Sequence, residues 1–228
     1  MDVPWLPEHE LAESTNWIAP HLGAFGTVGG NVPLGYEAYV SVRNGQDNAL
    51  DLMSEPFPDI AGSRLDHLLA LLAPATGEQD CFFAMWEGFG GMFRERDGST
   101  AGFGMMIGWH EDEAPPSREE MERKTREAND AYVARLPLRP DRPHLRLPFR
   151  DYYVWQGPLA SARLFASYPW QQSPTLAWPS DRSWFVNSDL DTGTTEVGGR
   201  SDVLSALLEE PWNGRLVRPE DPLVDAEG

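Results

Sequence analysis

The sequence predicts an α+β protein, with a mostly antiparallel sheet and about three short helices packed on it. Apolar and polar residues alternate in several short segments, which is the pattern of strands that bury one face. In other segments leucines recur at the spacing of one helix face. The chain has 228 residues, of which 41% are hydrophobic and 11% aromatic. This composition excludes a disordered chain and is enough to bury a core.

The first elements follow from two tryptophans and one alternating segment. Residues 1–33 show little periodicity, and we expect an N-terminal arm that packs Trp5 and Trp17 onto the body. Residues 34–218 are expected to form a single α+β domain. A strand is predicted over Tyr36–Val42, where apolar and polar side chains alternate.

A leucine-rich helix is predicted after that strand. Ser63 and Asp66 have the spacing of a capping box, in which each side chain accepts a hydrogen bond from the backbone of the other residue. Pro74 is expected to end the helix. Its apolar face is formed by Leu65, Leu68, Leu69 and Leu72.

Further strands are expected along the rest of the chain. Cys81–Trp86 is an uninterrupted apolar run, typical of a strand covered on both faces. Phe103–Trp109 is expected to be its antiparallel neighbour. The remaining strands are expected at Tyr152–Gln156, Ser183–Ser188 and Thr194–Val197, with a closing helix between Ser201 and Pro211.

Residues 111–150 are predicted to form an exposed helix followed by an extended insertion rich in proline and arginine. Ser117 and Glu120 again have capping-box spacing, and the helix that follows is polar nearly all round. Acidic and basic residues four apart would stabilise it, in the pairs Glu119–Arg123, Glu120–Lys124 and Glu122–Arg126.

The insertion concentrates positive charge in an acidic protein. Between Arg135 and Arg150, five arginines stand against Asp141 alone. These arginines would dock onto the acidic body, or they would bind an anion or an acidic partner, because a guanidinium binds carboxylate and phosphate bidentately. Residues 219–228 are expected to form a solvated acidic tail.

The charge of the whole chain limits its partners. It has 36 acidic and 18 basic residues, a net charge of −18. Such a surface repels phosphate backbones and anionic lipids, so we expect neither nucleic acid nor a membrane as a partner. The chain starts with acidic residues rather than a secretory signal, and its apolar runs are too short to cross a bilayer. We therefore expect a cytoplasmic protein.

Known catalytic and cofactor-binding motifs are missing from the sequence, which contains no P-loop, GxSxG or HExxH motif and no dinucleotide-binding glycine loop. Cys81, the single cysteine, is expected in the core with a raised thiol pKa. His110 with Asp112 could ligate a metal, and Asp189–Gly193 resembles the start of a calcium loop. A helix start and a tight hairpin explain these two segments more simply. We predict no metal, cofactor or catalytic residue.

Tryptophans beside polar residues are the best candidates for a binding site. Clustered indoles with a few polar anchors form the kind of apolar cleft that binds small molecules and peptides. Core packing is the alternative, favoured for Trp86 and Trp184, whereas Trp170 and Trp178 are expected in a loop among prolines. The candidate residues are Trp86, Glu87, Trp170, Trp178, Asp181 and Arg182.

Two parts of the sequence resemble known families. Leu176–Val186, with the later Val197–Gly199, is similar to a stretch of uncharacterised actinobacterial proteins, and Cys81–Gly90 resembles their other aromatic block. That resemblance implies no activity. Pro33–Gly45 is similar to the opening of the SUKH superfamily, which includes immunity proteins against secreted toxins. That block is a helix in the superfamily, whereas the alternation and the β-branched residues favour a strand here.

Two classes of function remain. The first is a non-catalytic binding or interaction module, for example an immunity-type inhibitor whose acidic surface occupies a basic effector protein. The second is a small-molecule-binding protein or hydrolase-like enzyme that uses the aromatic cleft, with Glu87, Asp181 or Arg182 as polar contacts. Salt-sensitive binding to a basic protein would favour the first class. A deep pocket joining Trp86, Glu87 and Asp181 would favour the second.

Overall fold

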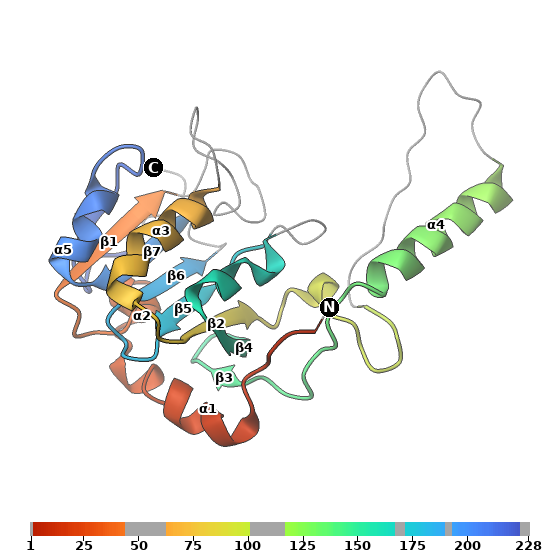
Figure 1. The fold of residues 1–228 in the computed structure, drawn as a ribbon, viewed down its shortest axis with the longest axis horizontal. Coiled ribbons are helices and arrows are strands. Elements are labelled where there is room, and N and C mark those ends of the chain that lie inside the picture. Colours follow the sequence, from red (N-terminus) through yellow and green to blue (C-terminus); the bar gives the residue numbers. More distant parts are fainter. Residues whose placement is uncertain (1, 44–62, 101–116, 167–171, 190–192, 224–228) are drawn as a thin grey trace. The chain divides into compact units, whose positions relative to one another are not determined.

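The chain divides into two compact units. A computed structural model describes residues 2–43, 63–100, 117–166, 172–189 and 193–223, and these residues confirm the α+β class (Figure 1). Met1–Val3 and Glu87–Arg142 form unit 1, and Pro4–Trp86 and Pro143–Gly228 form unit 2. All the strands described below belong to unit 2, so it is this unit that positions the candidate sites.

In its described residues, unit 2 contains an eight-stranded sheet. Its strand order is β3-β4-β2-β5-β6-β7-β1-β8, and each neighbouring pair is antiparallel, which confirms the expected sheet type. The strands are β1 (Ala38–Arg43), β2 (Cys81–Trp86), β3 (Leu145–Arg146), β4 (Asp151–Gly157), β5 (Leu176–Pro179), β6 (Phe185–Asp189), β7 (Thr194–Gly199) and β8 (Arg215–Val217).

Most of the strands follow from alternating or apolar segments. β1, β2, β4, β6 and β7 confirm five predicted strands to within a few residues, and the predicted strand Phe103–Trp109 lies outside the described residues. β3, β5 and β8 were not expected, because strands of two, four and three residues are too short to show a periodic pattern. β5 pairs with both β2 and β6, so the loop predicted around Trp178 is wrong.

The helices are more numerous than the three expected. In the described residues they are α1 (Glu8–Thr15), α2 (Val28–Asn31), α3 (Arg64–Thr76), α4 (Arg118–Val133) and α5 (Ser201–Leu204). 3-10 helices lie at Ala19–His21, Gly90–Met92, Leu159–Phe165 and Ser205–Leu208. The predicted helices correspond to α3, to α4 and to α5 with the 3-10 helix after it. The others are short or fall in residues 1–33, where the sequence shows little periodicity.

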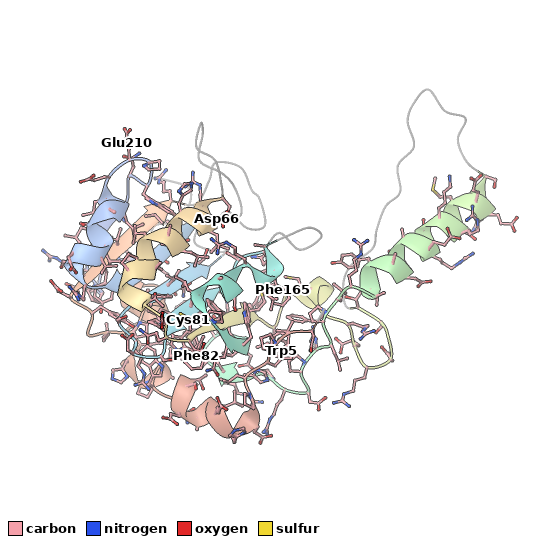
Figure 2. All side chains as sticks on the ribbon, viewed as in Figure 1. Trp5, Asp66, Cys81, Phe82, Phe165 and Glu210 are labelled. Atoms are coloured by element: carbon pink, nitrogen blue, oxygen red, sulfur yellow. The ribbon has the colours of Figure 1, made fainter. Side chains whose placement is uncertain are left out.

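The N-terminus of α3 has the predicted capping box, and Asp66, one of its two members, is labelled in Figure 2. Ser63 Oγ accepts a hydrogen bond from the backbone N–H of Asp66 at 3.1 Å, and Asp66 Oδ2 accepts one from the N–H of Ser63 at 3.0 Å. Asp66 Oδ1 also accepts a bond from Arg163 Nε at 2.5 Å. The capping box therefore fixes where α3 begins, and Arg163 adds a contact from a distant part of unit 2.

α3 continues beyond Pro74, so the predicted end of the helix is wrong. The last residue, Thr76, is buried, and its hydroxyl donates a hydrogen bond to the carbonyl of Leu72 at 2.8 Å. The same hydroxyl accepts a bond from Trp184 Nε1 at 3.0 Å. These contacts hold the last turn, and the helix ends before Gly77, whose φ of +62° favours glycine.

Both faces of the sheet are covered. On one face, the core joins Phe82, Trp178 and Phe185 of the sheet to Ile18 and Val32 of the N-terminal segment. On the other face, the leucines of α3 lie against side chains of β5 and β6 and against the indole of Trp184 just before β6. The sheet is therefore the middle layer of unit 2.

Trp5 and Trp17 pack onto the sheet as expected. The ring centroid of Trp5 lies 6.3 Å from that of Trp155, and the two rings are nearly perpendicular. The ring of Trp17 meets Trp178 and Phe185 edge-on, with centroids 6.5 and 6.0 Å apart. Aromatic edge-to-face contacts of this kind attach the N-terminal segment to the sheet.

The N-terminal segment is also tied to residues 219–223. The N–H of Gly29 donates to the carbonyl of Pro219 at 2.8 Å, and the N–H of Val28 donates to that of Asp221 at 3.0 Å. In the reverse direction, the N–H of Leu223 donates to the carbonyl of Gly26 at 3.0 Å. Three backbone bonds thus join two segments that are far apart in the sequence.

In unit 1, the polar helix α4 begins as predicted. Ser117 Oγ accepts a hydrogen bond from the N–H of Glu120, and Glu120 pairs with Lys124 at 3.1 Å. The other predicted pairs are replaced by Arg118–Glu122 at 2.9 Å and Arg123–Glu127 at 2.8 Å. Both replacements also join residues four apart, so the exposed helix has the expected type of ion pair with different partners.

The arginines of residues 135–150 make contacts inside each unit. In unit 1, Arg139 Nε lies 3.0 Å from Glu95 Oε1, and its guanidinium lies 5.5 Å from the ring centre of Phe93. In unit 2, the guanidinium of Arg150 lies 4.8 Å from the ring centre of Trp86. Cation–π contacts therefore accompany the ion pairs in this stretch.

Candidate functional site

Two of the predicted site residues, Trp86 and Asp181, lie at opposite ends of β2. Cys81, at the start of β2, pairs with Pro179, at the end of β5. Asp181 follows β5, so it lies at the opposite end of β2 from Trp86. Glu87 belongs to unit 1, whereas Trp86 and Asp181 belong to unit 2. Trp86 and Asp181 therefore do not meet in the kind of pocket that would favour the second class of function.

Trp178 is a core residue rather than a binding residue. Its side chain is fully buried, and its ring stacks on those of Phe82 and Phe185, with centroids 5.7 Å away in each case. Trp184 is also buried, as expected. Trp170 lies outside the described residues.

Arg182 is the predicted residue that does line a cavity. It lies in the turn after β5 with a φ of +59°, and its guanidinium lies 4.8 Å from the ring centre of Trp17. Its Nη2 donates to the carbonyl of Glu13 at 3.3 Å. Within the described chain, no carboxylate pairs with this guanidinium. The turn thus holds the positively charged guanidinium of Arg182 against the indole of Trp17.

Asp181 shapes the same turn. Its carboxylate accepts a hydrogen bond from the N–H of Ser183 at 2.9 Å, and its own N–H donates to Gln79 Oε1 at 2.8 Å. Partial burial acts to raise the pKa of the Asp181 carboxyl, but the hydrogen bonds with Gln79 and Ser183 outweigh it and lower this pKa. The Asp181 carboxylate therefore stays charged, and its hydrogen bonds stabilise the turn.

A cavity of about 380 Å³ lies between this turn and the N-terminal segment. Its walls come from residues 17–21, 34–37, 182–183 and 199–200, all in unit 2. The volume falls within the usual range for sites that bind small molecules. Four segments of the chain therefore build one hollow next to Arg182.

Two residues of the cavity wall carry side-chain hydroxyls that are enclosed by protein. These groups are the phenol of Tyr36 and the hydroxyl of Ser183. Burial, together with the neighbouring Tyr39 phenol, raises the pKa of Tyr36 well above its usual range, so it stays protonated. Both hydroxyl oxygens lie beneath the cavity wall rather than on its open surface, so the charged side chains of the wall are the groups that a ligand would meet.

Charged residues of both signs line the cavity. Arg182 and Arg200 contribute guanidinium groups, and Glu37 contributes a carboxylate. Arg200 Nε pairs with Asp202 Oδ1 at 3.0 Å, so Arg182 is the cation with fewer anionic contacts. The cavity can therefore recognise an anionic group at Arg182 and a cationic group at Glu37.

Sequence reasoning missed Trp17, Tyr36 and Ser183 as site residues. The alternating pattern predicts Tyr36 as the first residue of a strand, and the sequence predicts Trp17 as a packing residue of the arm. A residue with either of these roles can also line a cavity. The four wall segments are far apart in the sequence, and no local motif joins them. The sequence prediction names Arg182 as a polar contact of an aromatic cleft, and the structure places Arg182 in the wall of this cavity.

Metal and thiol chemistry have little support in the described part of the chain. It contains no group of three or more His, Cys, Asp or Glu side chains that could hold a metal, and His110 and Asp112 lie outside it. Asp189 pairs with Thr194 across a β6–β7 hairpin, which confirms the hairpin interpretation of this segment. Burial is the main cause, and the charge of Asp80 the second, that raise the pKa of Cys81 to about 12. The Cys81 thiol is therefore a poor nucleophile.

Two more findings concern the whole chain. Of the helices within the described ranges, none is both long enough and apolar enough to cross a bilayer. Comparisons with protein-family models, with curated proteins and with solved structures give no match to this chain.

Proposed function

We propose that this protein binds a small organic molecule that carries both a carboxylate and an amine, in the cavity beside Arg182. The observation that carries this proposal is the guanidinium of Arg182 beside that cavity, which pairs with no carboxylate among the described residues. Binding supplies an anionic partner for this guanidinium.

Arg182 is suited to bind the carboxylate. Its guanidinium lies against Trp17, which leaves the N–H groups at its edge to form paired hydrogen bonds with the two carboxylate oxygens. A charge-assisted pair of this kind is stronger than a bond between neutral groups.

Glu37 is suited to bind the amine. A cavity with only cationic walls would favour a simple anion, but this wall also carries a carboxylate. A ligand with one charge of each sign would neutralise both groups, whereas a simple acid would meet repulsion from Glu37. Amino acids are the smallest common molecules with this charge pattern.

The proposal is tested by isothermal titration calorimetry. The probes are amino acids, the matching hydroxy acids without the amine, and the matching amines without the carboxylate. We expect at least one amino acid to bind about tenfold more tightly than both of its analogues, which corresponds to about 1.4 kcal/mol. Equal binding of the three classes, or no binding of any amino acid, would contradict the proposal.

Two substitutions test the role of each charge. Arg182→Gln is expected to weaken amino-acid binding about ten- to hundredfold, because it removes a charge-assisted pair. Glu37→Gln is expected to reduce the preference for the amino acid over the hydroxy acid. Arg215→Gln is the matched control, since Arg215 is an exposed arginine of β8 outside the cavity. Equal losses in R182Q and R215Q would argue against the site.

A basic protein partner is the second candidate function, favoured by the net charge of −18. α1 carries Glu8, Glu10 and Glu13 without a lysine or arginine, which would attract such a partner. We expect affinity for a basic partner to fall steeply as salt rises from about 0.05 to 0.3 M, because screening shortens the range of the attraction. Replacing the three glutamates by glutamine should weaken this binding, whereas R182Q should leave it nearly unchanged.

A further inference from the structure

A series of contacts joins Arg182 to Leu34 along the wall of the cavity of about 380 Å³. The guanidinium of Arg182 lies 4.8 Å from the ring centre of Trp17. The carbonyl of Trp17 accepts a hydrogen bond from His21 Nδ1 at 2.6 Å, and the carbonyl of His21 accepts one from the N–H of Leu34 at 2.7 Å. All four residues line the cavity. One wall therefore runs from a charged end at Arg182 to an apolar end at Leu34.

Leu34 is held in place with its side chain partly open to solvent. It is 42% exposed, although it is a large apolar residue. Its loop is fixed by the phenol of Tyr39, which donates to the carbonyl of Pro33 and accepts from the N–H of Tyr36, both at 3.1 Å. Gly35 turns the loop with a φ of +105°, which favours glycine. Because this loop is already ordered, a ligand can cover the leucine with little loss of conformational entropy.

The wall between Arg182 and Leu34 presents rings rather than further charges. The ring centroids of Trp17 and His21 lie 6.3 Å apart, so an indole and an imidazole follow one another along it. Gly35 and Gly199 also line the cavity, and neither has a side chain that would fill the space in front of it. A ligand side chain that follows this wall therefore meets ring and leucine surface.

The volume of the cavity exceeds what a small amino acid needs. Glycine or alanine would fill only a minor part of about 380 Å³ and would leave water against Trp17 and Leu34. Removing apolar surface from water is favourable in proportion to the area buried. A ligand with a large apolar side chain would displace this water, so it gains affinity that a small one does not.

We propose that the ligand of this cavity is an amino acid with a large apolar side chain, such as leucine or phenylalanine. This inference rests on the function proposed above and names its substrate class. Arg182 binds the carboxylate, and the side chain extends along Trp17 and His21 to Leu34. A short side chain does not reach the leucine, and a polar one loses its hydration there without a hydrogen-bond partner.

The proposal is tested by isothermal titration calorimetry of the full chain with four amino acids. Leucine and phenylalanine are the large apolar probes. Alanine has a short side chain, and asparagine has nearly the shape of leucine with a polar amide. We expect leucine or phenylalanine to bind at least tenfold more tightly than both alanine and asparagine. Equal binding of all four would overturn this inference but not the proposed function, whereas no binding of any amino acid would overturn both.

Substitution of Leu34 locates the apolar end of the site. Leu34→Ala should weaken binding of the large apolar amino acids about tenfold more than binding of alanine, because only a long side chain reaches this position. A general disturbance of the fold would weaken both equally. Leu216→Ala is the matched control, since Leu216 is 63% exposed on β8 and lies outside the cavity. The same preference in L34A and L216A would overturn the placement.

Leu34→Glu tests the same placement by changing the preference. The variant carries a carboxylate at the end of the wall away from Arg182, where the ammonium group of a bound lysine would lie. We expect L34E to bind lysine at least tenfold more tightly than the wild type does and to bind leucine more weakly. A ratio of lysine to leucine affinity that does not change would show that the ligand side chain does not reach residue 34, and would overturn the inference.

Discussion

Gly198 of β7 determines where the phenol of Tyr36 lies. A Cβ atom at this position would lie 2.6 Å from Cδ2 of Tyr36 and 2.7 Å from Cγ1 of Val32. The missing side chain therefore allows the Tyr36 ring to pack against the sheet beneath the wall of the cavity.

Gly198→Ala is expected to lower the free energy of unfolding by about 1–3 kcal/mol, because the added methyl group overpacks a buried position. Gly199→Ala is the control in the same strand, since its Cβ atom would find its nearest neighbour at 3.4 Å, an ordinary contact. Urea unfolding followed by tryptophan fluorescence measures both. Equal destabilisation by the two variants would contradict the argument from close packing.

Tyr36→Phe separates stability from binding. The phenol is buried without a partner in the described part of the chain, so removing it is expected to leave the free energy of unfolding unchanged or to raise it by about 1 kcal/mol. Ligand binding in the cavity should stay nearly unchanged, because the hydroxyl is enclosed by protein and does not reach a ligand there. Urea unfolding and calorimetry check the two effects, and a clear loss of stability would show that the hydroxyl has a partner in the free protein.

α3 shows how local signals define an element. The Ser63–Asp66 capping box sets its start, and the buried leucines hold it against the sheet. Pro74 was expected to end it, but the hydroxyl of Thr76 binds both Leu72 and Trp184, and these contacts stabilise the turn after the proline. A tertiary contact thus outweighs the local preference.

Ser63→Ala is expected to cost about 1 kcal/mol of stability, because the first turn of α3 loses its cap. Ser117→Ala at the start of α4 is the comparison, since it removes the same kind of cap from an exposed, mostly polar helix. Thermal unfolding followed by circular dichroism at 222 nm, a wavelength that reports helix content, would compare the two. A smaller loss in S63A than in S117A would contradict the view that α3 stabilises the sheet.

The Arg163–Asp66 pair predicts a dependence of stability on pH. The hydrogen bond from Arg163 is the largest effect on the pKa of Asp66; it and the bonds from Ser63 outweigh the opposing effect of burial and lower this pKa. A pKa that is lower in the folded state stabilises the fold above the unfolded value of about 3.9, and this stability is lost as pH falls through the folded value. The difference in urea midpoint between wild type and Asp66→Asn should therefore shrink below about pH 4. A difference that does not change with pH would exclude this linkage.

The sequence was informative about elements and poor about sites. Alternation and apolar runs identify β1, β2 and β4, because one or both faces of these strands are buried over several residues. β5 is four residues long and ends at Pro179, so no pattern separates it from a loop, and the burial of Trp178 was missed with it. The cavity beside Arg182 could not be predicted, because its walls meet only after the sheet has brought four distant segments together.

At the scale of the whole molecule, all eight described strands belong to unit 2, although the segment Glu87–Arg142 of unit 1 interrupts its sequence. The hydrogen bonds of the sheet and its two covering layers are therefore made without unit 1. The cavity beside Arg182 also consists of unit 2 residues.

Replacing residues 87–142 by a flexible glycine–serine linker of about fifteen residues is expected to leave a folded unit 2. The shortened protein should unfold cooperatively in urea and keep the near-ultraviolet circular dichroism of its buried tryptophans. R182Q in the shortened protein should again weaken amino-acid binding. A non-cooperative transition would show that the sheet requires residues of unit 1.

The three backbone bonds between residues 26–29 and residues 219–223 have a consequence for protein synthesis. On the ribosome, the glycine-rich loop emerges early, but its partners are translated only after every strand of the sheet. The loop therefore lacks these three hydrogen bonds, with Phe25 exposed, until synthesis has passed β8. Chains arrested before residue 219 should show rapid amide hydrogen exchange at Val28 and Gly29, and released chains should show protection there.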